Sequence, residues 1–372
     1  MKVIYKPKPR IVVIGLKGLP AFGGAATVGE NIINQLKDDY DFTVLSISSH
    51  TSKEFAIVNG VKQVIFRNYG SGSFNTLVYF LKCLVHVWFN KYDLVYLHHA
   101  ESGFITPFLR LRCKVVVTFH GVQMIDQDPK FSQIHNWFFR FSQRLNIRWA
   151  NMIVSVSKPH KDYIYKKYNR VIEYIPNGMS PQFNNPKVEN KKNTKEYIFF
   201  SAARIYQIKG LHLLLKAAKK IVPPVKLIVA GDLDQVTNYK NEINDLTKGI
   251  NVEYLGLIRD KAYLMSKINE ATLFIFPSLT EAMSMMLLEA VSTMTPVIAS
   301  DIPSNKAVFT DNELLFFKNN DSEDLALKLQ NALDNPDIMA NKAKAAFEKL
   351  SKDYTWQSIA QQYSKIFKKM LS

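Results

Sequence analysis

Two cations and two carboxylates in the second half of the sequence have the types and spacing of an anion-binding site. Arg204 and Lys209 follow a short apolar run, and Glu281 and Glu289 lie eight residues apart beyond a later one. Two cations can bind a diphosphate, and a helix that begins near residue 283 adds free backbone N–H groups. The pattern predicts a diphosphate site built without a metal, with Glu289 accepting hydrogen bonds from sugar hydroxyls. Taken alone, the Glu spacing is a weak signal, and two surface glutamates are its default interpretation.

Short apolar runs alternate with amphipathic stretches, which is typical of parallel sheets with helices on both faces. Strands are predicted at residues 11–15, 43–47, 94–97, 114–119, 152–156, 171–175, 197–201, 226–230, 252–255, 273–276 and 296–299. Helices are predicted near 25–37, 74–90, 101–111, 131–149, 158–168, 210–221, 235–247, 260–269, 283–293, 322–333, 338–350 and 356–371. Arg204 and Lys209 then follow the C-terminal end of a strand, where open α/β sheets bind ligands.

Two domains are expected, because 372 residues would make an unusually large single core. A polar stretch at 184–195 separates the two strand–helix series. We assign residues 1–183 to an N-terminal domain, 196–354 to a C-terminal domain and 355–372 to a helix that packs back on the N-terminal domain. Each domain is predicted to be a doubly wound parallel sheet, and the two are expected to face each other across a cleft.

Composition narrows the class of protein. A chain with 47% hydrophobic and 22% charged residues is globular, and its two cysteines exclude a disulfide scaffold. Residues 1–180 hold 23 Lys and Arg against 11 Asp and Glu, which is +12 of the total charge of +16. Such a basic half can attract nucleic acid, an anionic membrane or a phosphorylated substrate. The apolar run at 11–14 is too short for a secretory signal, so a cytoplasmic protein is expected.

Two segments bear on membranes. The most apolar helix candidate, at 74–90, is interrupted by Lys82 and His86 and is shorter than the roughly 20 apolar residues of a span. The segment 131–150 mixes aromatic residues with Arg140, Arg144 and Arg148, which suits an interfacial helix. A half-buried domain helix with a basic edge explains the same pattern.

Other motifs are weaker. The glycines after the first strand, which include Gly23 and Gly24, match neither a dinucleotide fingerprint nor a P-loop. Asp-x-Asp triplets at 126–128 and 232–234 can hold a divalent cation, but they arise easily by chance among 32 acidic residues. We assign no residue to a metal.

Taken together, these motifs resemble glycosyltransferase family 4, whose members are retaining enzymes of the GT-B fold that use nucleotide-sugar donors. The resemblance rests on Glu281–Glu289 with the following 290–300, and on blocks at 14–24, 118–121, 154–157, 175–178, 203–210, 229–232, 254–256 and 276–278. The blocks follow the family's order and spacing over nearly the whole chain. The resemblance implies two Rossmann-like domains, the N-terminal one on the acceptor side and the C-terminal one binding the nucleotide sugar.

The resemblance also implies roles for single residues. Arg204 and Lys209 would hold the donor diphosphate and neutralise the leaving nucleotide. Glu281 would face the donor sugar, and Glu289 would bind the ribose hydroxyls. His120 would project towards the sugar, although a structural strand-end histidine is the alternative. The remaining expected contacts are the phosphate-capping amides of Met285, Met286 and Leu287, and the passage for donor phosphate or acceptor at Gly23 and Gly24.

Two departures from the family pattern concern specificity. Ala282, Met283 and Ser284 replace the usual Glu-x-Phe-Gly or Gly-Phe-Gly segment, and Ala26 stands where many relatives carry a glutamate. They leave the donor sugar and the handling of the acceptor open.

The expected function is transfer of a sugar, with retention, from a nucleotide donor that is UDP-linked rather than GDP-linked. The acceptor would be a glycan or a lipid-diphosphate-linked glycan in polysaccharide or capsule assembly, at the inner face of the membrane. Front-face attack, in which the leaving phosphate takes the acceptor proton, needs no dedicated nucleophile, so neither a metal nor another cofactor is expected. The alternatives are a GT-B epimerase or phosphorylase, a non-catalytic GT-B subunit, and a nucleic-acid-binding protein. The last lacks an RNA-binding motif.

Overall fold

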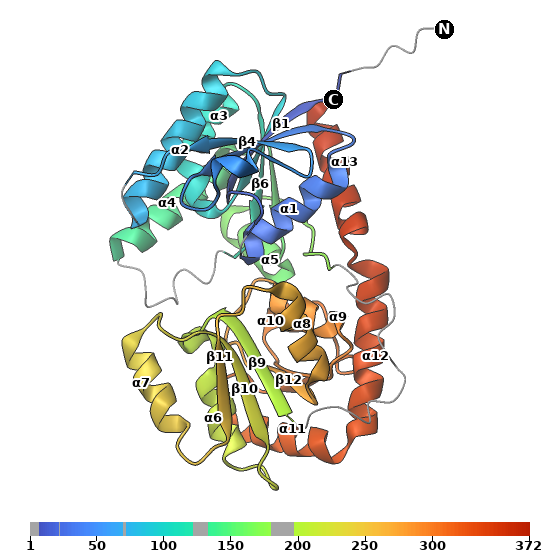
Figure 1. Cartoon of the computed structure of the whole chain (residues 1–372). Coiled ribbons are helices and arrows are strands. Elements are labelled where there is room, and N and C mark those ends of the chain that lie inside the picture. The colour runs from blue at the N-terminus through green and yellow to red at the C-terminus, as the bar shows by residue number, and fades with distance from the viewer. Residues whose placement is uncertain (1–6, 22, 70–71, 122–132, 180–196) are drawn as a thin grey trace. The chain divides into compact units, whose positions relative to one another are not determined.

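The chain forms two compact units, each built on a parallel sheet (Figure 1). The computed structural model describes residues 7–21, 23–69, 72–121, 133–179 and 197–372. The first unit comprises residues 1–178 and 356–372, and the second comprises 179–355. The polar stretch at 184–195 and the Asp triplet at 126–128 lie outside the described residues.

The sheet of the first unit has the strand order β3-β4-β2-β1-β5-β6-β7-β8 among the described residues. Every neighbouring pair is parallel except β3 and β4. The central strands are buried on both faces, which explains their continuous Val and Ile runs. The strands are β1 Arg10–Lys17, β2 Asp41–Ile47, β3 Ile57–Val58, β4 Val61–Phe66, β5 Leu94–His98, β6 Lys114–Phe119, β7 Met152–Ser155 and β8 Glu173–Tyr174.

Helices cover both faces of this sheet. On one face α3 and the 3-10 turn η2 each contact both α2 and α4, and on the other face α1 contacts α13. The helices are α1 Gly24–Leu36, α2 Gly72–Phe89, α3 Thr106–Arg110, α4 Gln133–Trp149, α5 Lys158–Tyr168 and α13 Trp356–Leu371, with 3-10 turns η1 Lys53–Phe55 and η2 Ala100–Ile105.

Helix α13 belongs to the core of the first unit although 177 residues of the second unit separate it from the rest. Its Tyr363 and Phe367 are fully buried, and both rings pack against Tyr96 of β5. The Tyr363 hydroxyl lies 3.2 Å from Thr118 Oγ1 on β6. A Cβ at Gly178 would lie 2.6 Å from the Trp356 ring, so only glycine fits where the chain leaves the first unit.

The second unit has the all-parallel strand order β11-β10-β9-β12-β13-β14 among the described residues. Its strands are β9 Tyr197–Arg204, β10 Lys226–Asp232, β11 Val252–Gly256, β12 Leu273–Phe276, β13 Val297–Ser300 and β14 Leu315–Phe317. Its helices are α6 Leu211–Ala218, α7 Thr237–Leu246, α8 Lys261–Glu270, α9 Met285–Ser292, α10 Pro303–Lys306, α11 Ser322–Asp334 and α12 Pro336–Asp353, with the 3-10 turn η5 Gln207–Lys209.

The prediction of parallel α/β sheets is confirmed, with local corrections. Strands β3, β4 and β14 were not expected, and the helix expected at 101–111 is a 3-10 turn followed by the short α3. Strand β4 was missed because the polar residues Lys62 and Gln63 interrupt its apolar run. Gln63 is buried, and its side chain accepts from Leu19 N–H and donates to the Leu19 carbonyl. It therefore fixes the glycine loop that follows β1.

We expect the first unit to lose stability in acid through His160. This side chain is 2% exposed, its Nδ1 lies 2.9 Å from Ser155 Oγ, and burial lowers its pKa to about 4. The unfolded chain, with a histidine pKa near 6.5, binds more protons between pH 6.5 and 4, so the unfolding free energy falls as the pH falls. Between pH 6.5 and 5 the loss from this one group is about 2 kcal/mol.

Urea unfolding followed by tryptophan emission measures this loss, because all four tryptophans lie in the first unit. His160→Gln should lose less stability than the parent chain over the same pH range. Equal losses in the two proteins would show that His160 protonates freely in the folded state.

Candidate active site

The strand order of the second unit reverses between β9 and β12, and the predicted anion-binding residues follow these two strands. Arg204 is the last residue of β9, and Lys209 lies in the 3-10 turn η5 just beyond it. Glu281 lies between β12 and α9. Ligands of open α/β sheets bind at such a reversal, outside the carboxyl ends of the strands. Four of the predicted residues, Arg204, Lys209, Glu281 and Glu289, thus come from the two loops and the one helix that meet there.

The two loops are joined by backbone. Leu279 N–H donates to the Ile208 carbonyl at 2.8 Å. Gly210 has a φ of +71°, and a Cβ there would overlap the carbonyl oxygen of Pro277. A residue other than glycine would push the loops apart and move Lys209 with them.

Lys209 and Glu281 form an ion pair across these loops. Lys209 Nζ donates to Glu281 Oε1 at 2.6 Å, and the two side chains are 21% and 9% exposed. Burial acts to lower the pKa of Lys209, but the Glu281 carboxylate outweighs it and raises the pKa above its ordinary value. The ammonium therefore stays charged, and two of its three N–H donors remain for a ligand.

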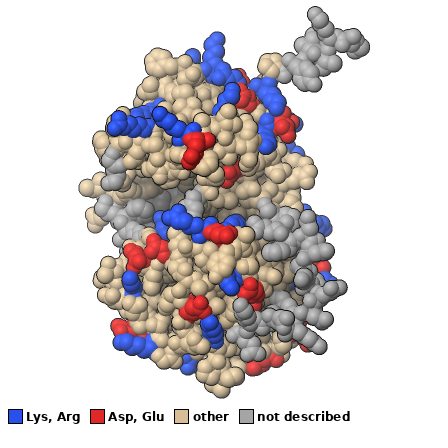
Figure 2. Space-filling view, in the orientation of Figure 1, with Lys and Arg blue, Asp and Glu red and all other residues tan. Residues whose placement is uncertain are grey.

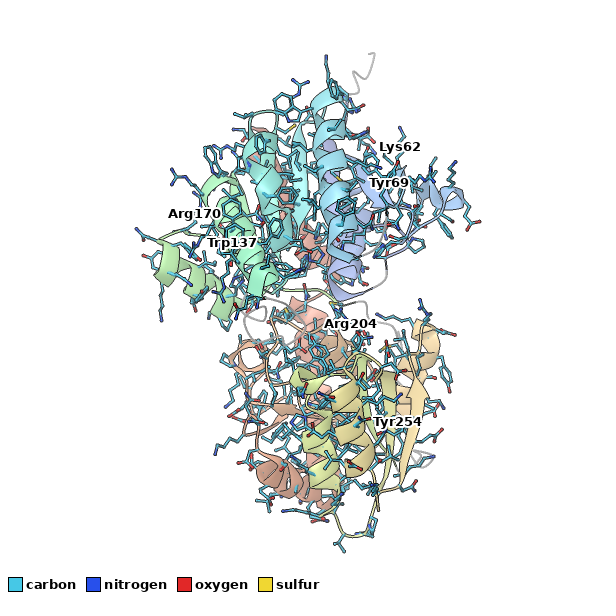
Figure 3. The ribbon with its side chains drawn as sticks, turned by 90° about the vertical axis from the view of Figure 1, so that its left-hand side faces the viewer. Lys62, Tyr69, Trp137, Arg170, Arg204 and Tyr254 are labelled. Atoms are coloured by element: carbon cyan, nitrogen blue, oxygen red, sulfur yellow. The ribbon has the colours of Figure 1, made fainter. Side chains whose placement is uncertain are left out.

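Arg204 adds a second positive charge beside Lys209. Its side chain is exposed, at the end of the second unit where β9 finishes (Figure 3). Its charge acts to lower the pKa of Lys209, which shows that the two cations interact. An anion that bound to both would relieve this repulsion.

Helix α9 begins at Met285, two residues later than predicted. Its N-cap Ser284 makes no side-chain hydrogen bond to the first turn. The amides of the first three helical residues therefore receive no cap, and they carry the positive end of the helix dipole. These are the predicted phosphate-binding amides of Met285, Met286 and Leu287.

Glu289 lies one turn further along α9 and is 14% exposed. It accepts a hydrogen bond from Lys261, the first residue of α8. Lys261, which lies 28 residues before Glu289, was not among the residues predicted from the sequence. The pair fixes the carboxylate on the α8 side.

The first unit brings histidines together at its own strand-order reversal, between β1 and β5. His98 ends β5, and His120 follows its neighbour β6. His98 Nδ1 lies 2.9 Å from His120 Nε2, and the rings stack with centroids 5.2 Å apart. His99, with a φ of 73°, places its ring 5.5 Å from that of His120. Sequence reasoning named only His120, although a His-His pair ending the adjacent strand was a signal for the others.

Gly23 and Gly24 lie exposed at the start of α1 in the same unit. Gly23 has a φ of +104°, and a Cβ there would meet nothing within 4 Å. Its requirement for glycine is therefore conformational. Gly15, at a φ of +107°, is different, because a Cβ there would lie 2.6 Å from the His98 carbonyl oxygen.

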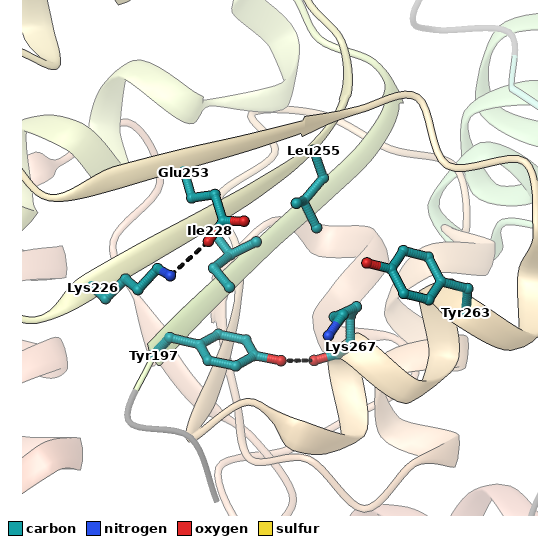
Figure 4. Close-up of a pocket in the computed structure, with 7 residues that line it drawn as sticks. All are labelled: Tyr197, Lys226, Ile228, Glu253, Leu255, Tyr263 and Lys267. Carbon is teal, nitrogen blue, oxygen red and sulfur yellow. Dashed lines mark hydrogen bonds and ion pairs between the residues drawn. The ribbon is translucent and has the colours of Figure 1, made fainter.

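A pocket of the second unit lies towards the amino ends of the strands and does not contain the predicted anion-binding residues (Figure 4). It is lined by Tyr197, Lys226, Ile228, Glu253, Leu255, Tyr263 and Lys267. Tyr197, Lys226 and Glu253 lie at or near the starts of their strands, and Lys226 pairs with Glu253 at 2.6 Å. Because ligands of parallel sheets bind at the carboxyl ends, this pocket is not the candidate site.

The structure also locates one Asp triplet. Asp232 accepts from Asp234 N–H at 2.9 Å, and Asp234 pairs with Lys240 at 2.5 Å. Among the described residues, no three His, Cys, Asp or Glu side chains come together as a metal site. The absence of a metal requirement stays a prediction.

The contact between His98 and His120 leads to a prediction about protonation. Burial holds the pKa of both residues well below the ordinary value, so both rings are neutral. His98 Nε2 is buried without a hydrogen-bond partner among the described residues. A buried N–H without an acceptor costs more than a buried bare nitrogen. We therefore expect His98 Nδ1–H to donate to His120 Nε2, which leaves His120 with a proton on Nδ1.

Histidine ¹⁵N chemical shifts in labelled protein report this tautomer. The parent chain should show a protonated Nδ1 and a bare Nε2 at His120. His98→Phe should release that preference, while His98→Asn, whose amide N–H can replace the donor, should retain more of it. A proton found on His120 Nε2 in the parent chain would reverse the assignment.

Two families match the chain, and together they span residues 22–349. The family described as Glycosyltransferase Family 4 matches residues 22–183, and the family described as Glycosyl transferases group 1 matches residues 182–349. The second match contains Arg204, Lys209, Glu281 and Glu289, and the first contains His120.

Individual relatives agree with these matches. The chain is 26% identical to the O-antigen chain mannosyltransferase RfbU of Salmonella typhimurium, over 87% of each chain. It is 25% identical to the UDP-Gal:alpha-D-GlcNAc-diphosphoundecaprenol alpha-1,3-galactosyltransferase of Escherichia coli, over 59% of this chain and 60% of that one. The solved structure of sucrose-phosphate synthase from Thermosynechococcus elongatus superposes with a TM-score of 0.82, at 18% identity, over 97% of this chain and 99% of that one. The chain therefore belongs to glycosyltransferase family 4 and is a glycosyltransferase of the GT-B fold.

Proposed function

We propose that this glycosyltransferase transfers a sugar, with retention, from a UDP-linked donor to a glycan or lipid-diphosphate-linked glycan in polysaccharide or capsule assembly. The observation that carries the donor half of the proposal is the Lys209–Glu281 pair at the strand-order reversal of the second unit. It lies between an exposed arginine and an uncapped helix start. Few ligands other than a diphosphate need this combination of charges and amides.

The chemistry asks for stabilisation of charge more than for a nucleophile. As the glycosidic bond breaks, negative charge develops on the leaving diphosphate and positive charge on the sugar. Arg204, Lys209 and the α9 amides act on the first, and Glu281 acts on the second. Because Glu281 uses only one of the three Lys209 donors, it can hold the ammonium in place while phosphate oxygens bind the other two.

In this proposal the leaving phosphate takes the proton of the acceptor hydroxyl as that hydroxyl attacks from the same face. His120 donates a hydrogen bond from Nδ1 to a hydroxyl of the transferred sugar. The neutral state of the imidazole suits this role, because an uncharged ring does not oppose the positive charge that develops on the sugar.

Glu289 binds the ribose hydroxyls of the nucleotide. It lies on the helix whose first turn binds the phosphates, about one turn from the Met285 amide. Lys261 leaves acceptor capacity on this carboxylate, since two oxygens offer about four lone-pair sites. The name of the Escherichia coli relative, which includes UDP-Gal, supports uridine as the base.

Two observations support the proposed acceptor. The relatives from Salmonella and Escherichia coli carry names of O-antigen and diphosphoundecaprenol glycan assembly. The basic excess of residues 1–180 favours a phosphorylated or membrane-bound acceptor.

No helix among the described residues is long and apolar enough to cross a bilayer. On the names of these relatives and the basic charge of the first half, we propose a cytoplasmic enzyme that is peripheral at the inner face of the membrane.

Nucleotide binding tests the donor half first. UDP should raise the melting temperature of the protein more than GDP or ADP does, and EDTA should leave the effect unchanged. Glu289→Ala should weaken UDP binding roughly 10- to 100-fold, because it removes hydrogen bonds to a charged group. Glu253→Ala is the matched control, since Glu253 is also paired with a lysine but lies at the opposite edge of the same sheet.

A melting temperature unmoved by every nucleotide would favour the non-catalytic GT-B subunit. Binding that depends strictly on Mg²⁺ or Mn²⁺ would contradict metal independence and return attention to the Asp-x-Asp triplets.

Turnover tests the role of Lys209. With the UDP-sugar that binds best, Lys209→Ala should lower kcat roughly 100-fold or more, because it removes a preorganised charge at the leaving group. Lys220→Ala, which breaks an exposed Lys–Glu pair in the same unit, should leave kcat unchanged. Full turnover by Lys209→Ala at saturating donor would refute the diphosphate assignment.

A further inference from the structure

Helix α2 is apolar on two opposite sides. Its inward side packs into the core of the first unit through Tyr79, Phe80, Cys83 and Val87, all at most 1% exposed. A second apolar row recurs at helical spacing and lies in solvent: Phe74, Leu77, Leu81, Val85 and Trp88 are 39–65% exposed, and Phe89 is 85% exposed. A surface helix normally has only one apolar side, so the outer row needs a partner that folding of this unit does not supply.

The neighbouring helices extend this row into a broad surface. On α4, Ile134 and Trp137 are 80% and 64% exposed, and the Trp137 ring stacks on that of Phe141. Leu111, just after α3, is 74% exposed. Figure 3 looks onto this side of the first unit and labels Trp137 on α4. We call the set the α2–α4 surface: Phe74, Leu77, Leu81, Val85, Trp88, Phe89, Phe108, Leu111, Ile134, Trp137, Phe141 and Trp149.

The charges on these helices have a single sign. The stretches 72–92, 106–121 and 133–161 contain no Asp or Glu. They contain Lys82 on α2, Arg110 on α3, and Arg140, Arg144 and Arg148 on α4. Arg110 donates to the Trp149 carbonyl at 2.9 Å and so joins α3 to α4. In the view of Figure 2, uncharged side chains cover most of the first unit, and small separate groups of Lys and Arg and of Asp and Glu lie among them.

We propose that the α2–α4 surface docks the first unit on an anionic lipid bilayer. Trp and Phe side chains enter the interface between head groups and acyl chains, and the arginines on the same helices bind lipid phosphates. The combination of many exposed aromatic and aliphatic side chains with arginines on the same helices is typical of a surface that lies in the lipid interface, which favours a bilayer over a protein partner. The inference deepens the proposed function, since it gives the lipid-linked acceptor a place beside the first unit, but the docking itself requires no transfer.

Four tryptophans make the docking measurable without a label. Trp88, Trp137 and Trp149 lie on the α2–α4 surface at 39–64% exposure, and the fourth, Trp356, is 5% exposed. Vesicles of phosphatidylcholine mixed with phosphatidylglycerol should shift the emission to the blue, and brominated lipids should quench it. Vesicles of phosphatidylcholine alone should do so far less.

Variants separate the two contributions. Arg144→Gln with Arg148→Gln should weaken binding to the mixed vesicles roughly 30-fold, about 5-fold for each charge. Lys216→Gln with Lys219→Gln, on or next to α6, is the matched control and should have no effect. Leu81→Gln with Trp137→Gln should abolish flotation with vesicles, whereas Leu327→Gln with Ile338→Gln, which are 70% and 55% exposed in the second unit, should not.

UDP binding and the melting temperature of each variant show that it is folded. Equal binding to both kinds of vesicle, or no blue shift with either, would overturn the proposal. So would sedimentation showing dimers that the Leu81 and Trp137 substitutions dissociate, because the surface would then belong to a second copy of the chain. Vesicle binding without any nucleotide binding would instead refute the proposed function and leave the docking surface intact.

Discussion

The close approach of two loops at the strand-order reversal of the second unit is the constraint on which the candidate site depends. Gly210 lies against the Pro277 carbonyl, and the Leu279–Ile208 hydrogen bond joins the same loops two residues away on each. At this spacing the side chain of Lys209 reaches Glu281. The ion pair is thus a product of backbone geometry, and its buried carboxylate keeps a partly buried ammonium charged.

The first unit follows the same rule with different chemistry. Its glycine at the reversal, Gly15, lies against the His98 carbonyl, and the pairing of β5 with β6 brings His98 beside His120. Two neutral imidazoles stand where the second unit has charged groups. Neutral hydrogen-bonding groups suit sugar hydroxyls, and a cluster of cations and free amides suits a diphosphate, so each unit by itself has the chemistry of one part of the donor that we propose.

The strands were predictable where burial on both faces forces a continuous apolar run, as in Ile11–Ile14 and Leu273–Phe276. The prediction failed for β4, because the buried Gln63 amide is satisfied by two hydrogen bonds to the Leu19 backbone. A hydropathy pattern counts this residue as polar and cannot show that it is buried. Arg204, Lys209, Glu281 and Glu289 were visible as a family pattern. Lys261, the partner of Glu289, was not visible in the sequence, because this contact depends on how α8 packs beside α9. The outer row of α2 was also hidden, since a sequence does not say which side of an apolar helix faces the core.

Helix α13 has a consequence for the order in which the protein can be completed during synthesis. The core around Tyr96 and Thr118 lacks Tyr363 and Phe367 until residues 356–371 have left the ribosome, by which time all of the second unit has been made. The second unit is continuous from 179 to 355 and needs no later segment. The second unit is therefore the one that can finish folding first, although its synthesis begins later. The first unit keeps part of one sheet face uncovered until α13 has been made and packs on it.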